Sequence, residues 1–236
     1  MTINFLELAY SVSYWLSYQN KIGREFMNSE SSLKYPITDF ITNIHNPVNQ
    51  IKLEEQHFLF DDRYIDIIIK NNGIATHTFE LKIAKYETTQ KKEKKRIIND
   101  LLRLYFMNKI YNTESYFIMS GEHEQFMSFF RSISKTSGKY DISPTSASIS
   151  DPIGFYTNWF RFSNSKDKLK KILIKKETNK DYKELYDCFE KDYKLRESSK
   201  LKKISLPNYI MTECVAITPI HSGAPLSHLV GIWKVY

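Results

Sequence analysis

The chain has 236 residues, of which 42% are hydrophobic and 26% are charged, and its formal net charge is +7. This composition excludes an intrinsically disordered chain and suffices for one sizeable hydrophobic core. No stretch approaches the roughly 18 uninterrupted apolar residues of a membrane-spanning helix, and the first residues lack the basic leader of a secretory signal. Two cysteines, Cys188 and Cys214, are too few for a disulfide framework or a cysteine-based zinc site, so we expect a protein of the reducing cytoplasm.

The first third of the chain predicts two helices followed by a strand. Aromatic and aliphatic residues recur at helical spacing over residues 5–27 and again over residues 28–44. Glu30 lies in the first turn of the second helix, and Pro36 is expected to kink or split that helix. Residues 49–60 are typical of a strand that enters a turn at the two aspartates that follow.

The middle of the chain predicts a hairpin, a helix and a buried strand. Residues 63–70 and 76–84 are strand-like, and the sequence Asn71-Asn72-Gly73 between them suits a tight turn. An amphipathic helix is expected over residues 89–112 because its apolar residues follow one stripe. Residues 114–121 are almost entirely apolar, as in a strand covered on both faces, and a further helix is expected directly after them.

The C-terminal part has a weaker pattern. Residues 134–150 are rich in Ser, Thr and Pro and indicate a linker, whereas residues 166–203 carry 14 Lys/Arg against 8 Asp/Glu and are expected to be helical. Two late strands are predicted at residues 209–220 and 228–236, and the sequence does not decide whether they join the main sheet. We therefore expect a core over residues 1–133, with the linker, basic helical segment and C-terminal strands of residues 134–236 packed on it as one domain.

Three charged side chains of the hairpin are expected to lie together. Glu80 and Lys82 point to the same face, about 7 Å apart along their strand, and antiparallel pairing around residues 71–73 sets Asp66 beside Glu80. Two carboxylates suit a hard cation such as Mg²⁺ or Mn²⁺, with the Leu81 backbone carbonyl as a further ligand. Lys82 would then orient a water molecule or stabilise a pentavalent phosphate. The alternative is an ordinary hairpin with an Asp–Lys salt bridge on its solvent-exposed face.

This pattern resembles that of the PD-(D/E)xK phosphodiesterases, which share the restriction-endonuclease-like fold. The resemblance rests on Asp66 in one strand, Glu80-Leu81-Lys82 in the next, and the helix and strand that follow, and it covers roughly residues 25–130. It implies an α/β fold with a mixed β-sheet core in the order αβββαβ, flanked by helices. Many members carry a further Glu in the helix before the first strand, which makes Glu30 the fourth catalytic candidate. Ile65 stands where the family's name has Pro, and the pattern of RecB-like members in the helix after the Lys is not met.

Basic residues are the candidates for contacts with a nucleic acid, since phosphate contacts supply most of the affinity for such a polyanion. These candidates are Lys92, Arg96 and Arg103 in the helix over residues 89–112, then Arg161, Lys170 and Lys171. Arg96, Asp100 and Arg103 are also the polar candidates for the site itself in that helix. The alternative for the basic segment is a solvated Lys-rich helix pair.

These features lead to three functional hypotheses. The first is a Mg²⁺- or Mn²⁺-dependent nuclease that acts on DNA. The family resemblance implies that such a nuclease serves restriction or anti-phage defence, as a homodimer or beside a partner protein subunit. The second is a non-catalytic module on the same fold that binds nucleic acid or protein, in which the charged cluster is only salt-bridged. The third is an effector nuclease that stays silent until an activator binds.

Overall fold

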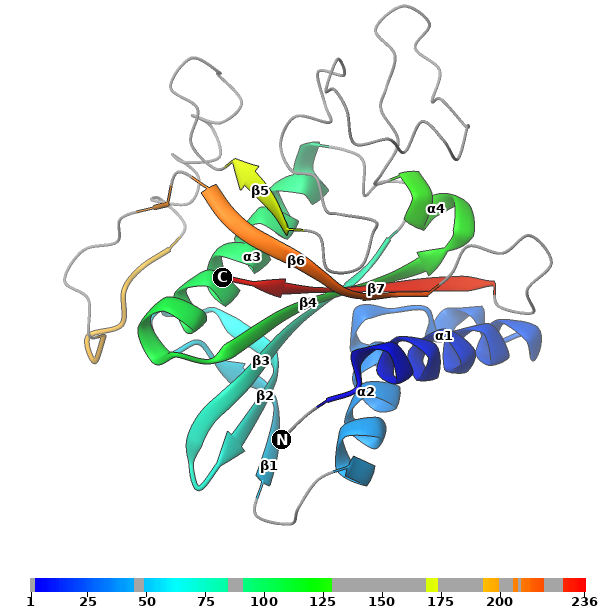
Figure 1. Ribbon diagram of the computed structural model, residues 1–236, viewed down its shortest axis with the longest axis horizontal. Helices are drawn as coiled ribbons and strands as arrows, with labels where there is room; N and C mark the ends of the chain where they lie inside the picture. Colours follow the sequence, from blue (N-terminus) through cyan, green and yellow to red (C-terminus); the bar gives the residue numbers. More distant parts are fainter. Residues whose placement is uncertain are drawn as a thin grey trace, which may run out of the picture.

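The computed structural model of the protein has one mixed sheet between two layers of helices (Figure 1). The structure describes residues 3–44, 49–84, 91–128, 169–173, 193–199, 206–207, 209–218 and 227–236. The strands are β1 (Asn49–Gln56), β2 (Tyr64–Asn71), β3 (Ile74–Ile83), β4 (Glu114–Glu122), β5 (Leu169–Leu173), β6 (Tyr209–Ile217) and β7 (His228–Val235). The helices are α1 (Phe5–Lys21), α2 (Glu30–Ile44), α3 (Lys91–Tyr111) and α4 (His123–Ser128), with a short 3-10 helix at Glu25–Met27.

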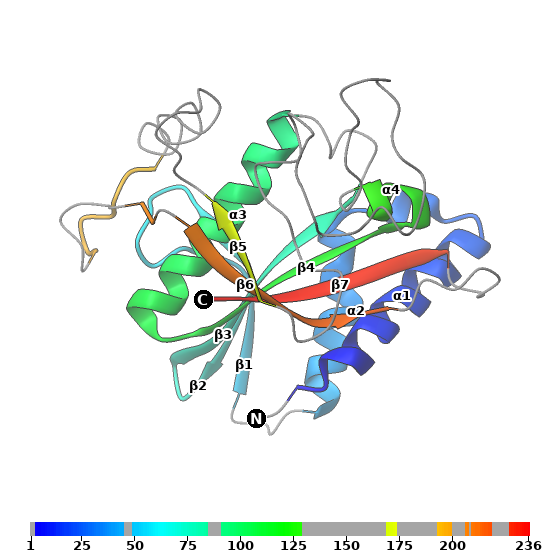
Figure 2. The ribbon, with the colours of Figure 1, turned by 45° about the horizontal axis from the view of Figure 1, so that its top comes forward.

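The strands that the structure describes form one sheet in the order β1-β2-β3-β4-β7-β6-β5. Among these strands, β3 and β4 run parallel, and the other neighbouring pairs are antiparallel. A parallel step needs a long crossover, which α3 supplies. Helices α1 and α2 cover one face of the sheet, and α3 and α4 cover the other (Figure 2). The expected mixed α/β architecture with flanking helices is thus confirmed.

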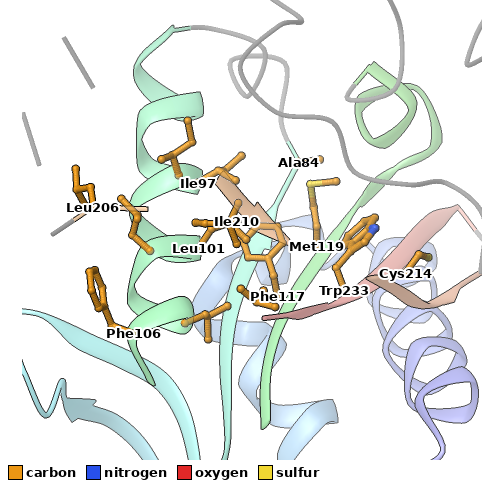
Figure 3. Close-up of a cluster of buried hydrophobic side chains, with 14 of the residues drawn as sticks. Ala84, Ile97, Leu101, Phe106, Phe117, Met119, Leu206, Ile210, Cys214 and Trp233 are labelled. Carbon is orange, nitrogen blue, oxygen red and sulfur yellow. The ribbon is translucent and has the colours of Figure 1, made fainter. Parts of the chain in front are cut away.

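Two hydrophobic clusters hold these layers together. On the face of α3, Ile97 and Leu101 pack toward Phe117, Met119 and Trp233 (Figure 3). The cluster on the opposite face includes Leu8, Val12, Leu16, Leu33, Ile37, Ile67, Phe79 and Leu81. Strand residues alternate between the two clusters because successive side chains point to opposite faces. Each fully buried Leu, Ile or Phe contributes about 1.5–3 kcal/mol, so burial on both faces dominates the stability of the sheet.

The predicted elements between residues 5 and 122 are present, with two differences in the helices. The first helix ends at Lys21 instead of continuing to residue 27, because Gly23 takes a φ of +75°, a conformation that stops a helix. Helix α2 runs through Pro36 without a break and is held by Leu33, Ile37 and Ile41, which are buried. The order α2-β1-β2-β3-α3-β4 is the one expected from the sequence.

The late strands join the main sheet, which the sequence left open. Strand β7 pairs with β4 along its whole length and β6 pairs with β7, so C-terminal residues lie in the middle of the sheet. The prediction of a helix over residues 166–203 is wrong at two places. Residues 169–173 form β5, which pairs with β6. Residues 193–199 are irregular, because their backbone groups bond to residues 59 and 61 instead of forming a helix.

Candidate active site

The pairing of β2 with β3 determines where the acidic residues of the hairpin lie. The antiparallel ladder ends at Ile67 opposite Phe79, so the next position sets Asp66 opposite Glu80. The Asp66 carboxylate accepts a hydrogen bond from the Leu81 backbone N–H, with 2.8 Å between Oδ2 and N. The expected adjacency of Asp66 and Glu80 is therefore present. The Leu81 backbone, expected to offer its carbonyl to a metal, here uses its N–H to hold Asp66.

Lys34 of α2 joins Asp66 to the edge strand β1. Its Nζ lies 3.4 Å from Asp66 Oδ1 and 2.5 Å from Glu54 Oε1. Burial by itself lowers the pKa of Lys34, but the contacts with Glu54 and Asp66 outweigh burial and raise that pKa, so the ammonium stays charged. Glu54 has a φ of +49°, in the left-handed region that residues with side chains rarely adopt. Its two neighbours on β1 pair with the two neighbours of Asp66, so this strained residue lies directly beside the site.

Glu80 is buried, with 2% of its surface exposed, and both of its carboxylate oxygens are held by Arg103 of α3. Arg103 Nε lies 2.7 Å from Oε1 and Nη2 lies 2.9 Å from Oε2, the bidentate geometry that suits a guanidinium and a carboxylate. Nη2 also donates to Asp100 Oδ1 at 2.8 Å, and Nη1 donates to the Tyr193 hydroxyl at 3.3 Å. The Arg103 side chain therefore joins Glu80, Asp100 and Tyr193 at the site.

This position of Arg103 corrects its expected role as a surface contact to phosphate. Its side chain is 14% exposed and faces Glu80, although the helical pattern put it toward the polar side of α3. The physical reason is the buried Glu80 carboxylate, since a buried charge without a partner is far more costly than a paired one. A long arginine side chain at the border of the apolar stripe can reach inward to supply that partner.

Lys82 and Glu30 form the other half of the cluster. Lys82 is buried, and its Nζ lies 2.8 Å from Glu30 Oε1, whose side chain is 46% exposed. Glu30 opens α2, where the Ser29 hydroxyl accepts a hydrogen bond from the Ser32 backbone N–H at 3.2 Å and so caps the helix. The cap fixes where the first turn of α2 lies, so Glu30 reaches the site as expected from the sequence.

The cluster is acidic, and its inner carboxylates, Glu80 and Asp100, are buried. Burial raises the pKa of Glu80 well above its usual range, while the charge and hydrogen bonds of Arg103 oppose that shift. Burial likewise raises the pKa of Asp100 to about 6, opposed by the charges of Arg103 and Lys82. The ion-paired groups of this cluster are the carboxylates Glu30, Glu54, Asp66, Glu80 and Asp100 and the cations Lys34, Lys82 and Arg103. With all of them ionised, the formal charge of the cluster is −2.

The donor types suit a hard divalent cation, but their arrangement does not present them to one. Carboxylate oxygens are the ligands that Mg²⁺ and Mn²⁺ prefer. Within the described residues, however, no group of three or more His, Cys, Asp or Glu side chains is placed to hold a metal ion. Both oxygens of Glu80 already accept from Arg103, and one oxygen of Asp66 accepts from Leu81. The protein itself thus supplies partners for both carboxylates.

The remaining basic candidates are only partly covered by the structure. Arg96 is exposed on α3. Lys92 lies in α3, and Lys170 and Lys171 lie on β5, with side chains outside the described part. Arg161 and the expected linker over residues 134–150 are outside the described residues altogether.

Sequence reasoning missed three members of the cluster: Lys34, Glu54 and Tyr193. Lys34 carries a readable signal, because it lies four residues after Glu30 on the same helix face. Glu54 depends on a local distortion of β1, and Tyr193 comes from a segment predicted to be helical. Neither has a sequence pattern that points to this site.

No helix among the described residues is both long and apolar enough to cross a membrane. No protein-family model matches the chain, and neither the curated proteins nor the solved structures give a match.

Proposed function

We propose that the protein is a metal-dependent nuclease with the restriction-endonuclease-like fold and a PD-(D/E)xK type of site. The observation that carries the proposal is the convergence of Asp66, Glu80, Lys82 and Glu30, which come from β2, β3 and α2. The order α2-β1-β2-β3-α3-β4 and the parallel pairing of β3 with β4 support the same fold. With every group ionised, the formal charge of the cluster is −2, which one divalent cation would neutralise.

Each residue has a role under this proposal. Asp66 and Glu80 would hold Mg²⁺ or Mn²⁺, which when bound supplies charge neutralisation at a scissile phosphate and a more acidic water. Lys82 brings a positive charge to the place where negative charge develops, and Glu30 orients Lys82. Arg96 and the basic residues of 166–203 would contact phosphates of the substrate, for which DNA is our choice. Restriction or anti-phage defence in the cytoplasm, with a second copy or a partner subunit for control, is the setting we propose by analogy with the fold.

The proposal predicts cutting of DNA that depends on Mg²⁺ or Mn²⁺ and on two named side chains. Asp66→Asn and Lys82→Met should each lower the cleavage rate by about a hundredfold or more, since each removes a charge needed in the transition state. The measurement is cleavage of labelled duplex DNA, single-stranded DNA and RNA by the purified protein with either metal.

Matched controls for that assay are Asp62→Asn and Lys52→Met, which remove the same charges from exposed positions near β2 and on β1. Both should cut like the natural protein. Cleavage that survives Asp66→Asn and Lys82→Met would overturn the proposed site.

A non-catalytic binding module is the second candidate, because one specific observation favours it. The carboxylates Asp66 and Glu80 each already have a cationic partner, and Lys82 has an anionic one. Such a cluster is stable without a metal. Calorimetric titration separates the two candidates: heat of Mn²⁺ binding that disappears in Asp66→Asn supports the nuclease, and its absence from the natural protein supports the module.

A further inference from the structure

We propose that Arg103 is the positioning residue of this site and the internal competitor of its metal ion, an inference that rests on the proposed nuclease function. In the resting state the guanidinium holds Glu80 in place of a divalent cation. Metal binding then requires Arg103 to release Glu80 while it keeps its other two partners, Asp100 and Tyr193.

The first step of the argument is that Arg103 uses the atoms a metal would use. Both Glu80 oxygens accept hydrogen bonds from it, at 2.7 Å and 2.9 Å. A metal ion at Glu80 needs at least one of those lone pairs directed toward it. Arg103 and a metal ion therefore cannot both bind the two oxygens of Glu80, and binding of one weakens binding of the other.

The second step is that Arg103 has a place to remain after release. Its Nη2 donates to Asp100 at 2.8 Å, and its Nη1 donates to the Tyr193 hydroxyl at 3.3 Å, so two contacts survive the loss of Glu80. The guanidinium would stay paired with one buried carboxylate. After release of Glu80, Arg103 therefore has two other partners already within hydrogen-bonding distance.

The third step concerns what holds Arg103 from the far side. Tyr193 begins the segment 193–199, which is tied to the loop after β1 by two backbone hydrogen bonds, Asp61 N–H to Lys194 C=O at 2.9 Å and Arg196 N–H to Leu59 C=O at 2.8 Å. The Tyr193 ring also packs edge-on against Phe60, with the ring centroids 4.9 Å apart. A segment remote in the sequence thus holds the guanidinium, and the same contact remains available to Arg103 after it releases Glu80.

The test measures binding of Mn²⁺ alone, by the loss of the free-ion electron paramagnetic resonance signal, in the full-length protein. Arg103→Gln should bind Mn²⁺ about ten- to a hundredfold more tightly than the natural protein, because two charge-assisted hydrogen bonds no longer compete. Arg103→Lys, which keeps a positive charge but cannot hold both Glu80 oxygens, should tighten binding by a smaller factor of about two to ten. Adding Glu80→Gln to Arg103→Gln should abolish the gain.

Lys109→Gln is the matched control, since it removes one positive charge from an exposed position of the same helix and should leave Mn²⁺ affinity unchanged. If the natural protein binds Mn²⁺ through Asp66 but Arg103→Gln and Arg103→Lys bind it equally or more weakly, Arg103 is not a competitor, and the nuclease proposal still stands. If no form of the protein binds Mn²⁺, the nuclease proposal and this inference both fail. Arg103→Lys keeps the test decisive if Arg103→Gln does not fold.

Discussion

Several buried polar side chains of this protein depend on partners that lie far away in the sequence. Burial of Glu80 or Arg103 alone would lower the free energy of unfolding, and the ion pair between them offsets that loss. The neutral ring of His57 likewise depends on hydrogen bonds to other residues. Its Nδ1 accepts from the Leu59 backbone N–H at 3.0 Å, and its Nε2 faces the Arg103 carbonyl at 3.2 Å, so the neutral ring carries its proton on Nε2. His57 thereby links the loop after β1 to the helix that carries Arg103.

The first residue-scale prediction concerns acid stability. Burial lowers the pKa of His57 to about 3, against an ordinary value of 6.5, so the unfolded chain binds this proton at a higher pH than the folded one. The resulting stability is complete above pH 6.5 and is lost as the pH falls toward 3. Between pH 7 and pH 5 this one residue should cost the natural protein about 2 kcal/mol of unfolding free energy.

Urea denaturation at the two pH values checks this prediction. His57→Gln should show a pH-dependent loss smaller by about 2 kcal/mol, whereas the exposed His123→Gln should behave like the natural protein. Burial also lowers the pKa of His228, to about 4, but that contribution is present in all three proteins and cancels in the comparison. Equal pH dependence of His57→Gln and the natural protein would contradict the assignment.

At the scale of elements, the centre of the sheet is packed with little room to spare. Gly231 on β7 pairs with Met119 on β4 and with Ile217 on β6. A Cβ atom at position 231 would come within 2.2 Å of the Trp233 ring, which is fully buried. Glycine is therefore needed there for space, since its φ lies in the ordinary range for a strand.

Gly231→Ala should consequently lower the unfolding free energy by about 1–3 kcal/mol, the usual cost of an extra methyl group in a packed core. Chemical denaturation measures the change. In a Trp233→Leu background the same alanine should cost much less, because the ring that it meets is gone. If Gly231→Ala lowers the unfolding free energy equally in the Trp233→Leu background and in the natural protein, the loss does not come from contact with the Trp233 ring.

At the scale of the whole molecule, the C-terminal part completes the sheet that the N-terminal part begins. Strand β7 lies between β4 and β6, and its Trp233 belongs to the same cluster as Ile97, Leu101 and Phe117. The sequence suggested a core over residues 1–133 with the remainder packed on it. The topology means that such a core would expose one edge of β4 along its whole length.

A fragment of residues 1–133 should therefore not fold independently. We expect a circular dichroism signal without a cooperative thermal transition, and aggregation through the open edge of β4. Adding a separately produced fragment of residues 134–236 provides the control, because it supplies the missing strands. A cooperative transition for the fragment 1–133 alone would refute the argument.

The sequence by itself determined most of the local elements between residues 5 and 122 and the core of the candidate site. Period-two alternation and a tight turn were enough to bring Asp66 opposite Glu80, and helical periodicity placed Glu30 in the first turn of α2, because these geometries follow from a few consecutive residues. The tertiary structure decided that Arg103 turns inward to Glu80, that Tyr193 reaches Arg103, and that residues 169–173 pair as a strand. Those outcomes depend on which distant group a buried charge or an open strand edge meets, and a local pattern does not encode that partner.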